Sequence, residues 1–129
     1  MDKTRPFDDY FNDPHLTPAQ RIRMQLTRQL VHELYPDVTE QTHYAMPGFY
    51  PKGATKATQQ LFLLMANAKW LGIYGTQGLT AADLREFTTY GVTAGKGSLH
   101  VPYDMPKPPF KRLLQLIITH NTKRHKIKP

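Results

Sequence analysis

The residues best suited to contact a ligand are one histidine and two aromatic side chains. In the motif SLHVPY, Leu99 and Val101 alternate with His100, which predicts a half-buried strand with His100 pointing away from the core. Trp70 and Tyr74 share one face of an earlier expected strand, WLGIY, and could lie on the same face as His100. If that face is open, the three side chains form a small aromatic platform. The alternative is that both rings are buried under a helix.

The centre of the chain, residues 42–53 (THYAMPGFYPKG), is rich in aromatic residues and is interrupted by proline and glycine. Such turn residues hold the backbone in a fixed shape and present side chains from it. Lysines beside glycines, here and in the segment GKGS, are suited to an anionic ligand. We therefore predict a small-ligand or partner-binding surface at the edge of a sheet, and its expected residues are Tyr44, Met46, Phe49, Lys52, Tyr74, Lys96 and His100.

The sequence predicts no catalytic residue. Its histidines form no HExxH pair, and no nucleophile is accompanied by an activating base and a third orienting group. The segment GKGS, residues 95–98, is similar to the end of a phosphate-binding loop, but it precedes an expected strand and lacks the upstream glycine, so we expect a flexible connector. A non-enzymatic accessory module is the favoured interpretation.

One acidic group near the N-terminus has the residue types that bind a metal. Asp8, Asp9, Asp13 and His15 offer the carboxylate oxygens and imidazole nitrogen that iron prefers. The alternative is that these acids favour the start of a short helix, expected between Phe7 and residue 12, and that the histidine lies in a loop. With no cysteine in the chain, thiolate sites are excluded. We expect weak Fe2+ binding at most, and no other cofactor.

The net charge of +7 is concentrated in the last segment of the chain. Residues 1–104 carry ten basic and ten acidic side chains, whereas residues 105–129 carry seven basic side chains and no acidic one. One interpretation is a solvated helix face followed by a basic tail at residues 120–129. The other is weak, sequence-blind binding of nucleic acid through this segment, because no recognised nucleic-acid-binding motif is present.

The length of 129 residues predicts one domain spanning residues 1–129. The N-terminal segment has no apolar stretch of signal-peptide length. The longest apolar run, residues 61–66, is far shorter than the ~20 residues of a membrane-spanning helix. We therefore expect a soluble, cytoplasmic protein that has no membrane partner.

Periodicity predicts two long amphipathic helices. The first begins with a capping box at Thr17 and ends before Pro36, and Arg23 is expected on its solvent side. Its expected buried stripe, at a spacing of four, is Ile22, Leu26, Leu30 and Leu34. The last helix follows a proline-rich connector, and its expected buried residues are Phe110, Leu113, Leu114, Ile117 and Ile118.

Between the two helices we expect strands joined by short loops. The expected strands cover residues 40–44, 61–66, 70–74 and 98–103, and a short helix opens at Thr80. Residues 46–48 are expected to interrupt the first strand, and Phe49 and Tyr50 to resume the pairing. Each long helix must bury an apolar face, and the sheet is the only large surface available. The expected fold is therefore an α+β two-layer sandwich: an antiparallel sheet with two main helices on one face, a short inserted helix, and one sheet face partly open.

Three motifs in the right order resemble the YdhG-like family, also called DUF1801. Residues 45–53 (AMPGFYPKG) are similar to its GMPAF-type motif, residues 70–75 (WLGIYG) to its HIGFYP-like element, and residues 95–114 to its KGSIRFP-type strand, connector and final helix. This chain departs from the pattern at Ala45 and Gly48. The resemblance implies a frataxin-like α+β fold. It implies little about activity, although an iron-chaperone role assigned to one Bacillus relative makes iron delivery the alternative function.

Overall fold

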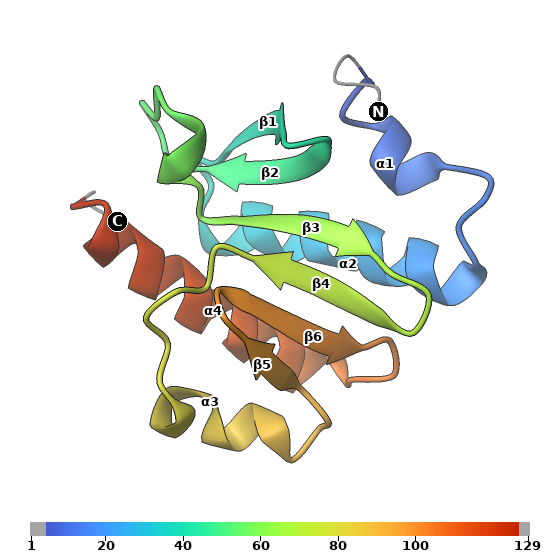
Figure 1. The fold of residues 1–129 in the computed structure, drawn as a ribbon. Helices are drawn as coiled ribbons and strands as arrows, with labels where there is room; N and C mark the ends of the chain where they lie inside the picture. Colours follow the sequence, from blue (N-terminus) through green and yellow to red (C-terminus); the bar gives the residue numbers. More distant parts are fainter. Residues whose placement is uncertain (1–4, 127–129) are drawn as a thin grey trace.

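The computed structural model describes residues 5–126, and these residues form one antiparallel sheet with helices behind it (Figure 1). The helices and strands follow the chain in this order: α1 (Asp9–Asn12), α2 (Pro18–Leu34), β1 (Thr39–His43), β2 (Met46–Tyr50), the 3-10 helix η1 (Ala57–Gln59), β3 (Phe62–Ala66), β4 (Trp70–Tyr74), α3 (Ala81–Thr88), β5 (Thr93–Gly95), β6 (Ser98–Pro102) and α4 (Lys107–Arg124). Within the described residues, no helix combines the length and the apolar character that a membrane span requires.

The sheet has six strands in the order β1-β2-β3-β4-β6-β5, and every pair of neighbours is antiparallel. β3 and β4 occupy the centre, as expected for the apolar run LFLLMA and its partner WLGIY. α3 lies in the connection between β4 and β5, and β6 inserts between β4 and β5. This arrangement places the motifs WLGIY and SLHVP side by side.

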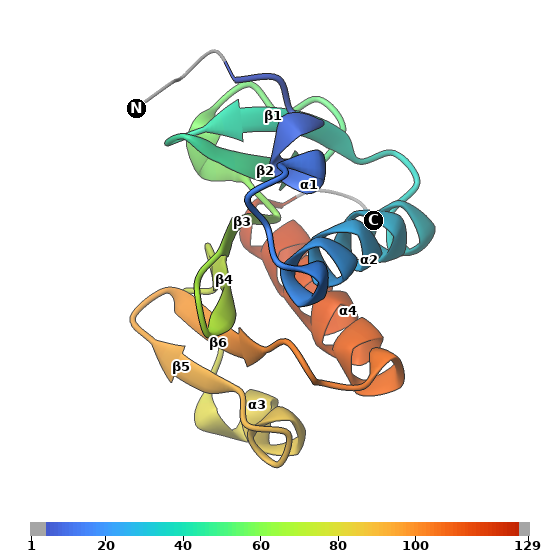
Figure 2. The same cartoon turned by 90° about the vertical axis from the view of Figure 1, so that its right-hand side faces the viewer.

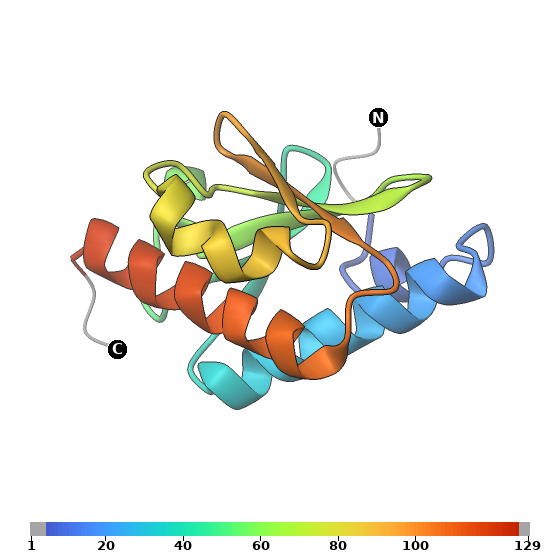
Figure 3. The same cartoon turned by 90° about the horizontal axis from the view of Figure 1, so that it is seen from below.

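The two long helices cover the same face of the sheet. Figures 2 and 3 show α2 and α4 on one side of the strands, with α1 and α3 also on that side, whereas within residues 5–126 the opposite face carries no α-helix. Leu64, Ile73, Leu99 and Val101 point toward the helices and are at most 1% exposed. On α4 the residues expected to be buried are all at most 3% exposed. The expected two-layer α+β sandwich is confirmed.

The expected buried stripe of α2 is wrong at its first turn. Thr17 and Gln20 form the expected capping box, but Ile22 is 67% exposed. Of the expected stripe Leu30 is fully buried, and the other buried residues of α2 are Arg23, Met24, Thr27 and Val31. Thr27 can occupy an apolar position because its hydroxyl donates to the carbonyl of Arg23, 2.7 Å away within the helix. The polar residue types at two of these positions conceal the true face of the helix from a search for apolar periodicity.

Arg23 is buried because it binds backbone carbonyls in the connector before α4. Its Nη2 donates to the carbonyls of Tyr103, at 2.9 Å, and Met105, and its guanidinium lies 4.5 Å from the ring centroid of Phe110. Burial lowers its pKa, although the charge of Asp104 opposes this effect. The expectation that Arg23 faces solvent was wrong, because the fold brings unpaired carbonyls to the buried side of α2.

The first hairpin also differs from expectation. Met46, Pro47 and Gly48 belong to β2 and pair with β1, and the turn falls at Tyr44 and Ala45 instead. Both turn residues have positive φ, 56° and 58°, as a two-residue hairpin turn of this hand requires. Glycine and asparagine usually occupy such positions, so the sequence carries no ordinary signal for this turn.

Two other expectations were wrong near the C-terminus. Residues 95–98 are no flexible connector, because they form the tight hairpin between β5 and β6, in which Gly95 pairs with Ser98. The expected basic tail at residues 120–129 begins later, because α4 continues to Arg124, with Asn121 and Thr122 buried. Residues 127–129 of that segment lie outside the described residues.

Candidate functional site

The candidate site is the face of the sheet that no helix covers, which we call the open face. Alternation along the strands assigns to it Met46, Gly48 and Tyr50 of β2, Leu63 and Met65 of β3, Trp70, Gly72 and Tyr74 of β4, and Ser98, His100 and Pro102 of β6. Met65 and Trp70 are 40% and 36% exposed, which is high for large apolar side chains in central strands.

Trp70 and His100 form an aromatic stack on the open face. The ring centroids are 4.5 Å apart and the ring planes differ by 15°. His100 pairs with Gly72 across the two strands, so Trp70 reaches it diagonally. Residue 72 is a glycine, so it adds no side chain of its own beside the stack. The platform expected from sequence is therefore open and is not buried under a helix.

Tyr74 lies along β4 over the same glycine. A Cβ atom built on Gly72 would be only 2.6 Å from the Tyr74 hydroxyl and 2.8 Å from Nδ2 of Asn67. The tyrosine ring therefore fills the space that a side chain at residue 72 would occupy. Together Trp70, His100 and Tyr74 make a low aromatic surface along the β4–β6 ladder.

One end of the open face is covered by the segment between β2 and β3. Tyr50 is fully buried there, and its hydroxyl donates to the carbonyl of Ala57 at 2.8 Å. Burial raises the pKa of Tyr50, so the phenol stays protonated and does not serve as a base near neutral pH. The ring of His43 lies 5.1 Å from that of Tyr50. This end of the face is closed, and the β4–β6 half is the accessible part.

The structure separates the residues that we expected to form one binding surface. Tyr44, 60% exposed, and Met46 lie at the end of the sheet where β1 turns into β2. Lys52, Tyr74 and Lys96 lie at or just beyond the strand ends at the opposite end of the sheet.

Phe49 does not belong to the expected surface. It points toward the helices, is fully buried, and packs on Phe7, Phe11 and Phe62. His100 lies between the two ends of the sheet, beside Trp70, which the expected residue set lacked. A ligand-binding role of the other expected residues stays a prediction.

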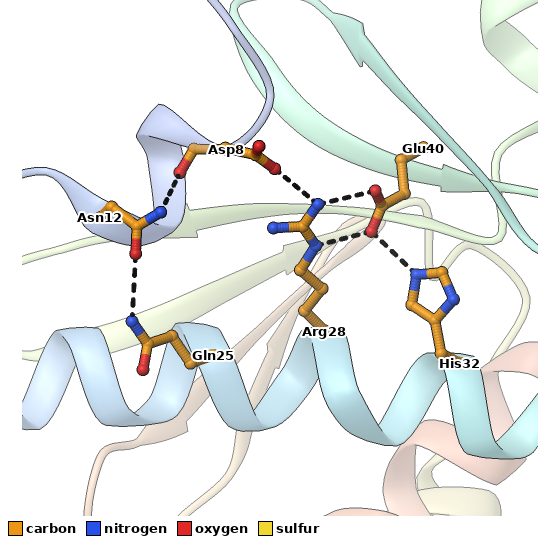
Figure 4. A network of polar contacts seen from close by, with 6 residues as sticks. All are labelled: Asp8, Asn12, Gln25, Arg28, His32 and Glu40. Carbon is orange, nitrogen blue, oxygen red and sulfur yellow. Dashed lines mark hydrogen bonds and ion pairs between the residues drawn. The ribbon is translucent and has the colours of Figure 1, made fainter.

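A polar network that sequence analysis missed joins α1, α2 and β1 (Figure 4). Arg28 donates from Nε and Nη2 to the two carboxylate oxygens of Glu40, at 2.7 and 2.8 Å, and from Nη2 to Asp8 at 2.7 Å. Nε2 of His32 lies 2.8 Å from the same carboxylate. No signal of spacing could have found it, because the pairing spans separate elements of the fold.

Electrostatics show that this network fastens elements together. The hydrogen bonds from Arg28 hold the pKa of Glu40 below its ordinary value, and the bonds to Glu40 raise the pKa of Arg28. The guanidinium also lies over the rings of Phe7 and Phe11, at 5.2 and 4.9 Å. Nε and Nη2 of Arg28 and both carboxylate oxygens of Glu40 are thus occupied by hydrogen bonds within the network. The hollow beside them, about 710 Å³, is lined by α1 and α2 residues including His32.

The acidic group expected to bind iron is largely occupied by arginines. Asp13 accepts from Arg5 at 2.6 Å, and Asp8 accepts from Arg28. Asp13 also lies 3.0 Å from the ring of His15, and the backbone N–H of His15, followed by Arg5, lowers the pKa of Asp13 to about 2. Within residues 5–126, no three histidine, aspartate or glutamate side chains gather as a metal site would require. Weak Fe2+ binding stays a prediction that these contacts do not support.

A solved structure of similar fold belongs to a DUF1801-family protein, YdhG from Bacillus subtilis. The two structures superpose with a TM-score of 0.70 over 93% of this chain and 90% of that one, at 16% sequence identity. No model of a known protein family matches the sequence, and no curated protein matches it. The similarity of the two structures shows that this chain has the YdhG-like fold of the DUF1801 family; it does not test the frataxin-like description.

Proposed function

We propose that this protein is a non-enzymatic binding module whose contact surface is the β4–β6 half of the open face. The observation that carries the proposal is the stack of Trp70 on His100, because the sole tryptophan of the chain is held partly exposed on a face that no helix covers. Tryptophan is strongly enriched among the residues that dominate binding energy in interfaces. An exposed, immobilised indole is therefore the first contact to consider.

The platform is rigid before any ligand arrives. β4 is paired on both sides, with β3 and β6, so Trp70 and Tyr74 project from the middle of the sheet. The single hydroxyl proton of Tyr103 is shared between the carbonyls of Trp70, 2.9 Å from the hydroxyl oxygen, and Asn67, which fixes the loop before β4. A preorganised surface loses little conformational entropy on binding, and this favours recognition.

The chemistry of the face favours binding over catalysis. His100 contacts the indole ring, and among the described residues its ring forms no hydrogen bond to a hydroxyl, including that of Thr93, its cross-strand neighbour in β5. Nucleophilic catalysis needs a base in contact with the attacking group. Tyr103 is also a poor acid or base near neutral pH, because burial raises its pKa to about 12. The ring surfaces of Trp70 and Tyr74 are the groups left to contact a ligand.

Titration of the indole signal tests the proposal directly. Because the chain has one tryptophan, its fluorescence and its indole N–H resonance report on Trp70 alone. Probes of distinct chemistry are added in turn: a mononucleotide, a short oligonucleotide, an aromatic peptide and a disaccharide. We expect at least one class to shift the indole signal in a saturable manner.

Matched variants give the control. His100→Ala removes the stacking partner and should weaken the response, whereas Ile22→Ala removes an exposed apolar side chain from α2 and should leave it unchanged. If every probe that binds leaves the indole signal of Trp70 unmoved, the open face is not the contact surface and the proposal is wrong.

A further inference from the structure

We infer that the open face binds single-stranded nucleic acid, with bases stacked against Trp70 and Tyr74 and phosphates beside the lysines at the two ends of the β4–β6 ladder. This inference rests on the proposed function, because it names the ligand of the same face. Proteins that bind single strands without sequence preference combine exposed aromatic side chains with a positively charged path for the backbone. The open face has both features.

The six strands that the structure describes place no acidic side chain on the open face. The six strands contain one carboxylate, Glu40, and it lies opposite Phe49 on the helix-covered face, where Arg28 binds it. Between residues 41 and 82 the chain contains no aspartate or glutamate and has three lysines. A ligand lying along β4 and β6 therefore meets no anionic side chain from these strands, which suits a polyanion.

Two lysines lie at the two ends of the β4–β6 ladder. Lys69 directly precedes Trp70 in the β3–β4 loop, and Lys96 lies in the β5–β6 turn, next to the pair formed by Tyr74 and Ser98. Both lysines are exposed. β4 has five residues, so these ends are separated by about 13 Å at the usual rise per residue. A strand of several nucleotides laid along the ladder would meet a cation at each end and rings between them.

Two of the other acidic side chains nearby are engaged elsewhere. Glu86 of α3 accepts from Arg112 of α4, and Asp83 caps the start of α3. Asp104, which follows β6, is exposed, and its charge raises the pKa of Arg23 against the larger lowering by burial. Glu86 and Asp83 are therefore occupied away from the path from Lys69 to Lys96, whereas Asp104 is an acidic side chain close to the Trp70 end of that path.

The shape of the surface selects single strands over duplexes. Base stacking on an indole needs an unpaired base whose ring face is free, which a duplex does not offer. A flat sheet face presents neither a helix nor a two-stranded ribbon that could enter a groove. The occupant is thus an unpaired strand, bound through rings and phosphates with little preference for sequence.

The experiment measures fluorescence anisotropy of a labelled thymidine oligonucleotide of about 12 nucleotides, titrated with the full chain at about 50 mM salt. We expect saturable binding that also changes the fluorescence of Trp70 in the wild-type protein. Trp70→Ala should weaken binding about ten-fold, from the usual stacking contribution per base. Ile22→Ala on α2 should bind like the wild type, and circular dichroism confirms that each variant is folded.

Charge variants separate the open face from the basic end of α4. Lys69→Gln and Lys96→Gln should each reduce the slope of log K against log salt by about 0.7, the value for one phosphate contact of a single strand. The matched control is Lys123→Gln, which removes an exposed cation from the last turn of α4 beside the end of α2, whereas Arg124 is left in place because it bonds Gln77 next to the β5–β6 turn. This control should leave the slope and the Trp70 response unchanged.

Two outcomes overturn the inference. No anisotropy change at about 50 mM salt excludes single-stranded nucleic acid, and a peptide or saccharide that still shifts the Trp70 signal would leave the proposed function intact. Binding that survives Trp70→Ala and is lost in Lys123→Gln would place the nucleic acid on the end of α4. In that case the open face does not bind nucleic acid.

Discussion

Replacing Arg28 by methionine tests whether the network of Figure 4 holds α1 and β1 to α2. The change keeps an alkyl chain of similar length over Phe11 but removes three charged hydrogen bonds, two to Glu40 and one to Asp8. Glu40, whose side chain is 21% exposed, keeps His32 as its only partner among the described residues. Losing the cation from a partly buried pair should cost about 2 kcal/mol, between the values for exposed and buried pairs.

The melting temperature converts this cost into a measurable shift. A chain of this size has an unfolding entropy of about 0.27 kcal/mol/K, so Arg28→Met should lower Tm by about 7 °C at pH 7. The control is Arg112→Met, which breaks an ion pair whose side chains are both about half exposed and should shift Tm by at most about 4 °C. If Arg28→Met lowers Tm no more than the control variant Arg112→Met does, the idea that the Arg28 network stabilises the fold more than an exposed ion pair is refuted.

The same comparison has a defined pH dependence. The pKa of Glu40 is lowered in the folded state, mainly by Arg28, so its stabilising contribution is present above the ordinary glutamate pKa of about 4.3. That contribution is lost as the pH falls through the lowered pKa and the carboxylate takes up a proton. The gap in Tm between wild type and Arg28→Met should therefore be widest above about pH 5 and narrow below about pH 4. A gap that widens on acidification contradicts this assignment.

Three further substitutions test other parts of the structure by thermal melts. Ile22→Ala should change stability by less than about 0.5 kcal/mol, because this side chain is exposed; a loss of several kcal/mol would return it to the core. Gly72→Ala should cost about 1 kcal/mol, because the new methyl group displaces the ring of Tyr74, and an unmoved Tyr74 ring resonance would contradict the close contact. Thr80→Ala should cost about 1 kcal/mol by removing the cap that accepts from the backbone N–H of Asp83; unchanged stability would show that the cap is dispensable.

The layered fold could be predicted because its signals are local. The capping boxes at Thr17 and Thr80 fix where two helices begin, and the spacing of apolar residues in α4 matches its buried face. Alternation in SLHVP fixes which side of β6 faces the helices. Two long apolar helix faces must then be buried against the one sheet, and the structure places both helices on the same side of the strands.

The errors arise where a distant contact overrides the local pattern. Arg23 is buried because the carbonyls of Tyr103 and Met105, about 80 residues away in sequence, accept its hydrogen bonds. The turn at Tyr44 and Ala45 forms because the pairing of β1 with β2 requires positive φ there. Positive φ strains the backbone of residues other than glycine, so neither residue type predicts a turn at this position. Such contacts exist only once the fold has formed.

The sequence predicted which side chains share a face at the candidate site, but it did not predict whether that face is exposed. Sequence alternation put Trp70, Tyr74 and His100 on one side of their strands, but it could not tell an open face from one covered by a helix. Which face of the sheet is covered depends on where α2, α3 and α4 pack. All three helices pack on the side that carries Leu71, Ile73 and Leu99.

The composition of the open face explains why the helices leave it free. A helix packs against a sheet by fitting its ridges between aliphatic side chains, and the helix-covered face of β4 and β6 supplies these. The open face offers Gly72 at its centre with rings laid beside and over it, so a docking helix would find a flat surface with few gaps to fill. A flat partner with its own rings would instead gain stacking contact over the whole platform. The glycine that makes this face poor for helix packing therefore makes it suitable for a planar ligand.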